Sequence, residues 1–298
     1  MQKPLRVFTT VWGQKYIDWF ERFCLRSLKF KKNKAALENA TWCFLTQAED
    51  QERLQKLIVA SGIKIKDLEF VIFGPEFKQN PHSAGAFINQ GLLLEIGKNI
   101  TYNTQMFLAP PDTIFGDGSI SSMREMARQR DSVIFAVHAR GLPEIESCIE
   151  DNMTNAQLVT AAFKNLHKTW SEAEDGREKV NSYVGGVSWK WIADNTYAVT
   201  HRLPTPYLIN WTPEDIVFFK NQIHWGVIDH AWPHDCLVHT ERIRTCGSSD
   251  AAFMVEITPA DKNIPPLAPY HHDEPDLFWK NLKHNQVNRM FSVILRGE

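Results

Sequence analysis

The chain has 298 residues, 43% hydrophobic and 23% charged, a composition that excludes wholesale disorder and collagen-like repeats. Lys and Arg total 33 against 35 acidic residues, so the formal charge of −2 provides no global positive field for nucleic acid. No window reaches the ~18 uninterrupted apolar residues of a membrane-spanning helix, and the first residues, MQKPLRVFTTVWG, lack the pattern of a secretory signal. Five cysteines without C-x-x-C spacing predict neither a disulfide framework nor a zinc ribbon, and a cytoplasmic location is expected.

The first 140 residues alternate between strand-like and helix-like segments. Apolar runs predict strands at 5–11, 41–46, 68–73, within 99–109 and at 132–138. Helical spacing predicts helices at 16–30, 49–61, 83–96 and 119–130, with Gly97 as the cap of the third. Strands separated by helices form a mostly parallel sheet covered on both faces. Its ligand edge is expected at four stretches that follow strands: 9–13, 47–50, 74–76 and 110–117.

This alternation ends after Arg140. Residues 142–170 look helical, 171–180 are a charged loop, and the following Trp- and Pro-rich pieces suggest short strands and long loops. Residues 273–298 return to a helix-like pattern that ends in the apolar piece MFSVIL. We therefore expect one composite α/β domain with two continuous halves, 1–140 and 141–298.

Aromatic residues and histidines are abundant, with 10 Trp, 18 Phe and 11 His. Two explanations stay open: a core built from large rings, or a cleft whose flat apolar faces stack sugars or bases. Trp19 and Trp42 fit the core. A candidate aromatic group for an acceptor site comprises Trp189, Trp191, Trp211, Trp225 and Trp232.

The most informative stretch is MFLAPPDTIFGDGSISSM, in which an apolar strand runs into Asp112. Together with VFTTVWGQKYIDWFERFCLRSL and TWCFLTQAEDQERL, it resembles the nucleotide-sugar glycosyltransferases of the GT-A fold, in an atypical bacterial or phage branch. The likeness covers roughly residues 5–140. It departs from the usual D-x-D motif, because two prolines precede Asp112.

The resemblance implies a nucleotide-sugar-binding first half and an acceptor-binding second half. Thr9, Thr10, Val11 and Trp12 would then face the nucleotide. Asp50 would accept from the ribose or base, although it also suits the first turn of a helix. Arg140 would pair with a phosphate or sugar carboxylate, although a solvated surface charge would look the same in the sequence.

A divalent cation, Mn²⁺ or Mg²⁺, is expected beside the donor diphosphate, because a hard cation on carboxylate oxygen neutralises the charge of the leaving group. The resemblance makes Asp112 its ligand and His201 the second ligand, with Asp117, Asp229 and Asp250 as further candidates. The alternative is that Asp112 only caps the turn after the prolines.

Asp229 and Asp250 are the predicted catalytic or sugar-contacting carboxylates, since an inverting transferase needs one carboxylate to remove the acceptor proton. A hydrogen-bonded turn aspartate is the competing interpretation of Asp229. His230, His234 and His239 could indicate zinc, but Pro233 disfavours the shared helix that such a site uses.

The sequence contains no P-loop, no G-x-G-x-x-G after the first strand and no G-x-S-x-G. We expect transfer of a sugar from a nucleotide-sugar donor to an acceptor hydroxyl on a cell-surface glycan or a modified nucleic-acid base. The alternatives are a metal-dependent hydrolase or nucleotidyltransferase on a similar sheet, and a non-catalytic carbohydrate-binding protein. The sequence does not determine the oligomeric state.

Overall fold

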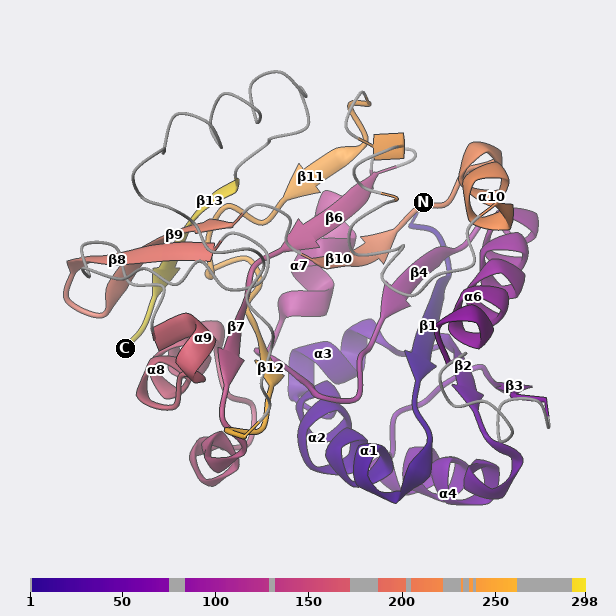
Figure 1. The fold of residues 1–298 in the computed structure, drawn as a ribbon, viewed down its shortest axis with the longest axis horizontal. Helices are drawn as coiled ribbons and strands as arrows, with labels where there is room; N and C mark the ends of the chain where they lie inside the picture. The colour runs from indigo at the N-terminus through magenta and orange to yellow at the C-terminus, as the bar shows by residue number, and fades with distance from the viewer. Residues whose placement is uncertain are drawn as a thin grey trace.

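The computed structural model describes residues 2–74, 84–128, 132–171, 187–201, 205–221, 232, 236–237, 240–261 and 291–298. Its centre is a seven-stranded sheet in the order β11-β6-β10-β4-β1-β2-β3 (Figure 1). The strands are β1 Leu5–Thr10, β2 Thr41–Thr46, β3 Asp67–Ile72, β4 Gln105–Leu108, β6 Val133–Ala136, β10 Thr205–Ile209 and β11 Ile243–Thr245. β10 runs antiparallel to both of its neighbours, whereas the other pairs are parallel. The predicted mostly parallel α/β sheet is confirmed.

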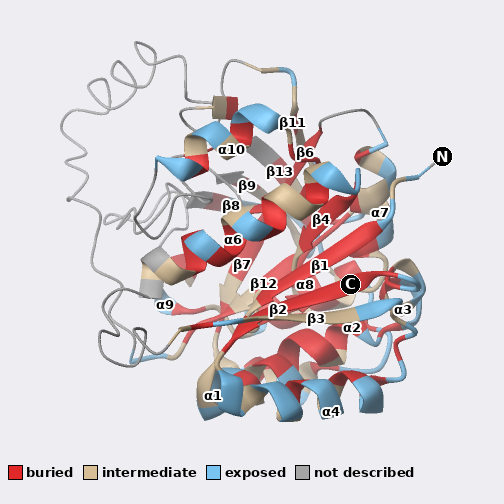
Figure 2. Cartoon of the chain, turned by 90° about the vertical axis from the view of Figure 1, so that its right-hand side faces the viewer, coloured by how far each residue is buried: buried red, intermediate tan, exposed pale blue. Residues whose placement is uncertain are grey.

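Helices cover both faces of this sheet (Figure 2). The helices of the first half are α1 Gly13–Trp19, the π-helix η1 Phe20–Leu25, α2 Arg26–Leu28, α3 Lys31–Ala36, the 3₁₀ turn η2 Ala48–Asp50, α4 Gln51–Ser61, α6 Ala84–Thr101 and α7 Ser119–Met126. Alternate residues of β2 face opposite sides, so Trp42 packs with the residues of α1, η1 and α4, while Cys43 packs with those of α6. Burial of both strand faces accounts for the continuous apolar runs in the sequence.

The largest differences from the predicted helix boundaries in the first half are at the ends of α6 and α7. α6 continues through Gly97, which therefore does not cap it, and ends at Thr101. Asn103 follows with a φ of 49° and takes the left-handed conformation that ends the helix. α7 stops at Met126, short of the predicted residue 130.

The predicted strand 132–138 divides between two sheets. β6 ends at Ala136 in the main sheet, and β7 His138–Gly141 enters a second sheet in the order β5-β12-β7, with β5 Thr113–Phe115 and β12 Met254–Ile257. β12 is antiparallel to β5 and parallel to β7. This small sheet lies between α8 (Asn155–Lys164) and the main sheet (Figure 1).

The rest of the second half is mixed. Its elements are the 3₁₀ helix η4 Pro143–Cys148, α9 Lys168–Ser171, α10 Pro213–Lys220 and a third sheet of β13 Phe291–Arg296, β9 Thr196–His201 and β8 Val187–Ala193. The closing apolar piece is thus a strand. Among the described helices, none has both the length and the hydropathy needed to cross a membrane.

Three of the tryptophans assigned to an acceptor site are core residues, which corrects that interpretation. Trp211 and Trp232 pack together with ring centroids 4.6 Å apart, and Trp189 donates its indole N–H to the carbonyl of Trp170 at 2.7 Å. All three are buried. Trp191 is 62% exposed, and Trp225 lies outside the described residues.

Candidate active site

The loops after β1, β2 and β4 are tied together at one edge of the main sheet. These strands are parallel neighbours, so their carboxyl ends meet at that edge. The backbone N–H of Val11 donates to Leu45 at 3.0 Å, and that of Ala109 donates to Phe8 at 3.0 Å. This is the edge at which open α/β sheets bind their ligands.

The four residues predicted to face a nucleotide, 9–12, alternate between the core and the edge of the sheet. Thr9 and Val11 point into the core, where the Thr9 hydroxyl accepts the indole N–H of Trp42 at 3.1 Å. Thr10 and Trp12 are half-buried, and the Trp12 ring packs edge-on against Phe73 at 5.0 Å. Thr10 and Trp12 are therefore the two side chains of this stretch that reach the edge.

Asp50 connects the β2 loop to the start of α1. Its carboxylate accepts the backbone N–H of Gly13 at 2.7 Å. Gly13 has a φ of 74°, a left-handed conformation that glycine adopts without strain. The contact supplies an acceptor for a helix N-terminus, so Asp50 has a structural task at the place where a ribose or base contact was predicted.

Asp112 lies in the turn between β4 and β5 and is half-buried. Its carbonyl accepts the backbone N–H of Ile257 at 2.7 Å, while Thr113 N–H closes the turn on Pro110 at 3.2 Å. These contacts place the end of β12 against the turn. The loop after the carboxyl end of β4 and the small sheet therefore meet at Asp112.

Three charged or ionisable side chains meet in the small sheet beside this turn. Glu256 of β12 lies opposite Arg140 of β7 and, on its other side, opposite Thr113 of β5. Its carboxylate is 3.0 Å from Nε2 of His138 and 3.3 Å from the Arg140 guanidinium. Nδ1 of His138 is 3.4 Å from the hydroxyl of Thr205 on β10.

These side chains differ in exposure: 25% for Glu256, 19% for Arg140 and 9% for His138. A partly exposed carboxylate flanked by an imidazole and a guanidinium can accept a proton, and the guanidinium can bind an anion. Arg140 was predicted from the sequence, whereas Glu256, His138 and Thr205 were not. The available signals were a single acid in the apolar run AAFMVEI and a histidine that ends SVIFAVH.

The remaining predicted residues lie elsewhere. Asp250 is exposed in a turn, where its carboxylate accepts from Ser248 at 2.8 Å and pairs with Arg296 of β13. Asp117 accepts the N–H groups of Lys32 and Asn33, at 2.8 and 3.2 Å, and so caps the start of α3. His201 ends β9, but its side chain is not among the described ones. Asp229 and the histidines His230, His234 and His239 lie outside the described residues.

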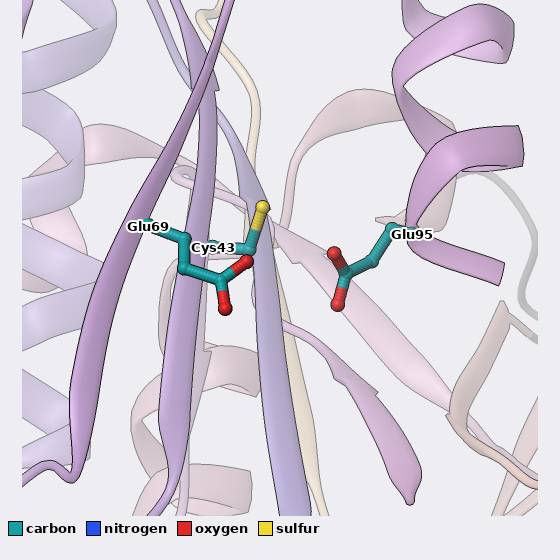
Figure 3. A group of neighbouring side chains, drawn as sticks. All are labelled: Cys43, Glu69 and Glu95. Atoms are coloured by element: carbon teal, nitrogen blue, oxygen red, sulfur yellow. The ribbon is translucent and has the colours of Figure 1, made fainter. Parts of the chain in front are cut away.

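One group of three side chains with metal-ligand chemistry occurs among the described residues: Cys43, Glu69 and Glu95 (Figure 3). It lies between the sheet and α6, away from the carboxyl edge. Arg6 binds both carboxylates, and Lys98 pairs with Glu69 at 2.5 Å, so two cations already balance the two acids. Burial raises the pKa of the Cys43 thiol, which disfavours the thiolate that a metal needs. The group is an ion-pair cluster that attaches α6 to the sheet.

This chain is similar to solved structures, and that similarity is one of fold. No family model and no curated protein sequence matches the chain. One similar structure is GalNAc-T7 with UDP, GalNAc and Mn²⁺, at 9% identity and a TM-score of 0.47, with 90% of this chain and 46% of that chain covered. A second is inositol-1-phosphate CTP transferase from T. maritima, at 10% identity and a TM-score of 0.38, with 88% of this chain and 94% of that chain covered. A third is mouse xyloside xylosyltransferase 1, at 12% identity and a TM-score of 0.33, with 45% of this chain and 52% of that chain covered.

These neighbours are glycosyltransferases and a nucleotidyltransferase, and at such identities the likeness concerns the fold alone. The matched segment spans about half the length of the xylosyltransferase and of GalNAc-T7.

Proposed function

We propose that this protein is a nucleotide-sugar-dependent glycosyltransferase. The observation that supports this most directly is the position of Asp112: it lies in the turn that follows the parallel strand β4, and its carbonyl accepts from Ile257, next to Glu256 on β12. The site thus offers one carboxylate for the donor and a second for the acceptor. An inverting glycosyl transfer that depends on a divalent cation uses both.

The donor would lie across the carboxyl ends of β1, β2 and β4. Trp12 offers a half-buried ring for the base, and Thr10 offers a hydroxyl beside it. The second carboxylate oxygen of Asp50 could accept from the ribose, since the first already binds Gly13. Arg140, partly exposed, would bind a phosphate oxygen of the donor.

A divalent cation fits Asp112 as a shared ligand. Mg²⁺ is commonly bound by one or two carboxylates plus substrate phosphates, and Mn²⁺ accepts the same hard oxygen ligands. Asp112 is half-buried at the edge where the diphosphate would lie, and we propose His201 as the second protein ligand. When bound, the cation would neutralise charge on the departing diphosphate.

Glu256 is the best-placed residue to accept the proton of the acceptor hydroxyl. In an inverting reaction the acceptor oxygen attacks the anomeric carbon, its proton passes to the Glu256 carboxylate, and the bond to the nucleoside diphosphate breaks with both electrons on the leaving oxygen. His138, 3.0 Å from the carboxylate, orients it. Asp229 remains the sequence candidate for the same role, and the variants Glu256→Gln and Asp229→Asn distinguish the two.

The test is a thermal-shift screen of nucleotides and nucleotide sugars with and without Mn²⁺ or Mg²⁺, followed by product analysis on an acceptor panel, because a ligand that binds only the folded state raises the Tm. Wild-type protein should release nucleoside diphosphate, and Asp112→Asn should lose this activity with its Tm retained. Asp67→Asn, an exposed acid on β3, is the matched control. Full activity of Asp112→Asn would overturn the assignment. Pyrophosphate release would indicate a nucleotidyltransferase, and binding without turnover would indicate a carbohydrate-binding protein.

A further inference from the structure

A stretch of strong positive charge begins in η1 and continues through α3. Residues 22–37 contain six basic residues and no acidic one, in a chain whose formal charge is −2. Such segregation leaves a local positive field on a protein that has none globally. The catalytic edge described above does not use this stretch.

The two arginines of the stretch are committed to internal contacts, whereas its lysines are not. Arg22 pairs with Glu146, and Arg26 donates to the carbonyl of Ile149 at 2.6 Å. Within the described part of the chain, no carboxylate pairs with any of the four lysines, which are Lys29, Lys31, Lys32 and Lys34. Three are exposed and Lys34 is half-buried.

The helix α3, which carries Lys31, Lys32 and Lys34, is held in place by hydrogen bonds at its start. The Asp117 carboxylate accepts the N–H groups of Lys32 and Asn33. The Asn152 side chain accepts the N–H of Lys31 at 2.7 Å, and the buried Asn33 side chain donates to the carbonyl of Gly116 at 3.0 Å. The start of α3 therefore has its backbone donors satisfied from within the protein, and its lysine side chains provide the available charge.

A fifth lysine extends the patch across the neighbouring loop. Asn39 N–H donates to the Lys64 carbonyl at 2.8 Å, which joins the loop before β3 to the end of α3. Nζ of Lys34 lies 3.3 Å from the position that a Cβ on Gly62 would take, so it reaches over the same loop. Lys64 is exposed and, among the described residues, has no acidic partner. We call Lys29, Lys31, Lys32, Lys34 and Lys64 the lysine surface.

Among the described residues, the acid that lies against α3 itself is Asp117, whose carboxylate accepts two backbone N–H groups at the start of the helix. Glu38 follows α3 and is exposed, and Asp67 begins β3 and pairs with the adjacent Lys66 at 3.7 Å. Glu150 and Asp151 precede the Asn152 that accepts from Lys31. Asp117 is therefore bound to the backbone of α3, and in the described part of the chain no carboxylate pairs with the lysine side chains of the surface.

We propose that the lysine surface binds the anionic headgroups of a lipid membrane. Five lysines without an acidic partner among the described residues suit headgroup adsorption, because an ammonium is a hydrated point charge that attracts a phosphate layer without a fixed bidentate geometry. The two arginines of the stretch are held in hydrogen bonds to Glu146 and to the carbonyl of Ile149. Single-stranded nucleic acid would need exposed aromatic rings for stacking, and Phe30, the ring within the patch, is 3% exposed. The inference is independent of the proposed transferase activity.

The test is co-sedimentation of the full chain with phosphatidylcholine vesicles that lack or contain phosphatidylglycerol, at low and high salt. Wild-type protein should bind the anionic vesicles at low salt and dissociate at high salt, because screening shortens the reach of charge. The triple variant K31Q/K32Q/K34Q should bind roughly tenfold more weakly or worse. The matched control K164Q/K190Q/K220Q removes the same charge from exposed positions elsewhere.

Several results would overturn the proposal. These are no binding of wild-type protein to anionic vesicles, equal weakening by both triple variants, and binding that persists at high salt. A fourth is binding of a random-sequence DNA oligonucleotide, lost in K31Q/K32Q/K34Q, in a protein that ignores vesicles. An unchanged circular dichroism spectrum and Tm show that both variants fold.

Discussion

The Glu95 carboxylate on α6 accepts hydrogen bonds from the Arg6 guanidinium on β1, inside the face of the sheet that α6 covers. The side chains are 0% and 5% exposed, respectively. Arg6 also reaches Glu69 on β3, at 2.8 Å, so one guanidinium holds a helix and two strands in register. The pairing explains how a chain can bury a charged group beneath an apolar helix: each ion has its partner, and the desolvation cost is offset.

Removing one member of this pair should be costly. Glu95→Ala leaves Arg6 without its main buried partner, and we expect the free energy of unfolding to fall by about 3–5 kcal/mol. Replacing both ions, as Arg6→Met with Glu95→Leu, should recover part of the loss, because the buried Arg6–Glu95 pair is then absent and Glu69 keeps Lys98 as its partner. Urea denaturation followed by circular dichroism measures both. A loss below about 1 kcal/mol in Glu95→Ala would show that the pair is not buried in solution.

The acid stability of the protein should depend on Glu69. The hydrogen bond from Arg6 lowers its pKa from 4.5 to about 2. The unfolded state therefore binds the proton first, so this contribution is complete above pH 4.5 and is lost as the pH falls towards 2. At neutral pH it is on the order of 2 kcal/mol once solvent screening is allowed for. Glu69→Gln should be less stable at pH 7 and lose less stability between pH 4.5 and 2. Parallel acid profiles of wild type and variant would contradict this.

The Mn²⁺ dependence of donor binding should require Asp112 and not the cluster of Cys43, Glu69 and Glu95. Lys98 and Arg6 already compensate the cluster, and burial raises the pKa of its thiol. Cys43→Ala should therefore leave the Mn²⁺ dependence of donor binding unchanged, while Asp112→Asn should abolish it. Isothermal titration of Mn²⁺ in the presence of a bound nucleotide measures both variants. Loss of Mn²⁺ binding in Cys43→Ala would instead assign the metal site to the cluster of Cys43, Glu69 and Glu95.

Glu256→Gln should lower the turnover of the proposed transfer by about 10²- to 10⁴-fold, since this carboxylate accepts the acceptor proton. Glu256 also pairs with Arg140, the proposed phosphate ligand, so donor affinity should change as well, by a much smaller factor. His138→Gln, which keeps a hydrogen-bonding side chain beside Glu256, should have a smaller effect and shift the pH profile. Steady-state kinetics with separate donor-affinity measurements provide the readout. A large rise in donor Kd with unchanged kcat would assign Glu256 to donor binding.

Asp117 and Asp250 should behave as structural and surface residues, respectively. Asp117→Ala removes the acceptor for two N–H groups of α3, and we expect a loss of about 1 kcal/mol. Asp250→Ala breaks an exposed ion pair and should cost less than about 0.5 kcal/mol. Thermal denaturation compares them. A large activity loss in Asp250→Ala with its Tm retained would instead support its predicted role at the donor or acceptor sugar.

Strand and helix periodicity in the first 140 residues predicted the α/β class, a mostly parallel sheet and a ligand edge at the stretch that contains Asp112. Periodicity indicates which face of an element each residue presents, and this local property can be determined from a single sequence. It also favoured a buried Trp42, which the structure confirms.

Only the tertiary structure decided which distant segments pair. β10 inserts antiparallel between β4 and β6, and the small sheet joins residues near 114, 140 and 255, so Glu256 meets His138 across a register that no local pattern encodes. The aromatic second half shows the same limit: composition permitted both a stacking cleft and a core for Trp211 and Trp232, and packing against Phe219 selected the core. Pairing and packing depend on how whole elements close around shared apolar surface, which is a property of the assembled chain.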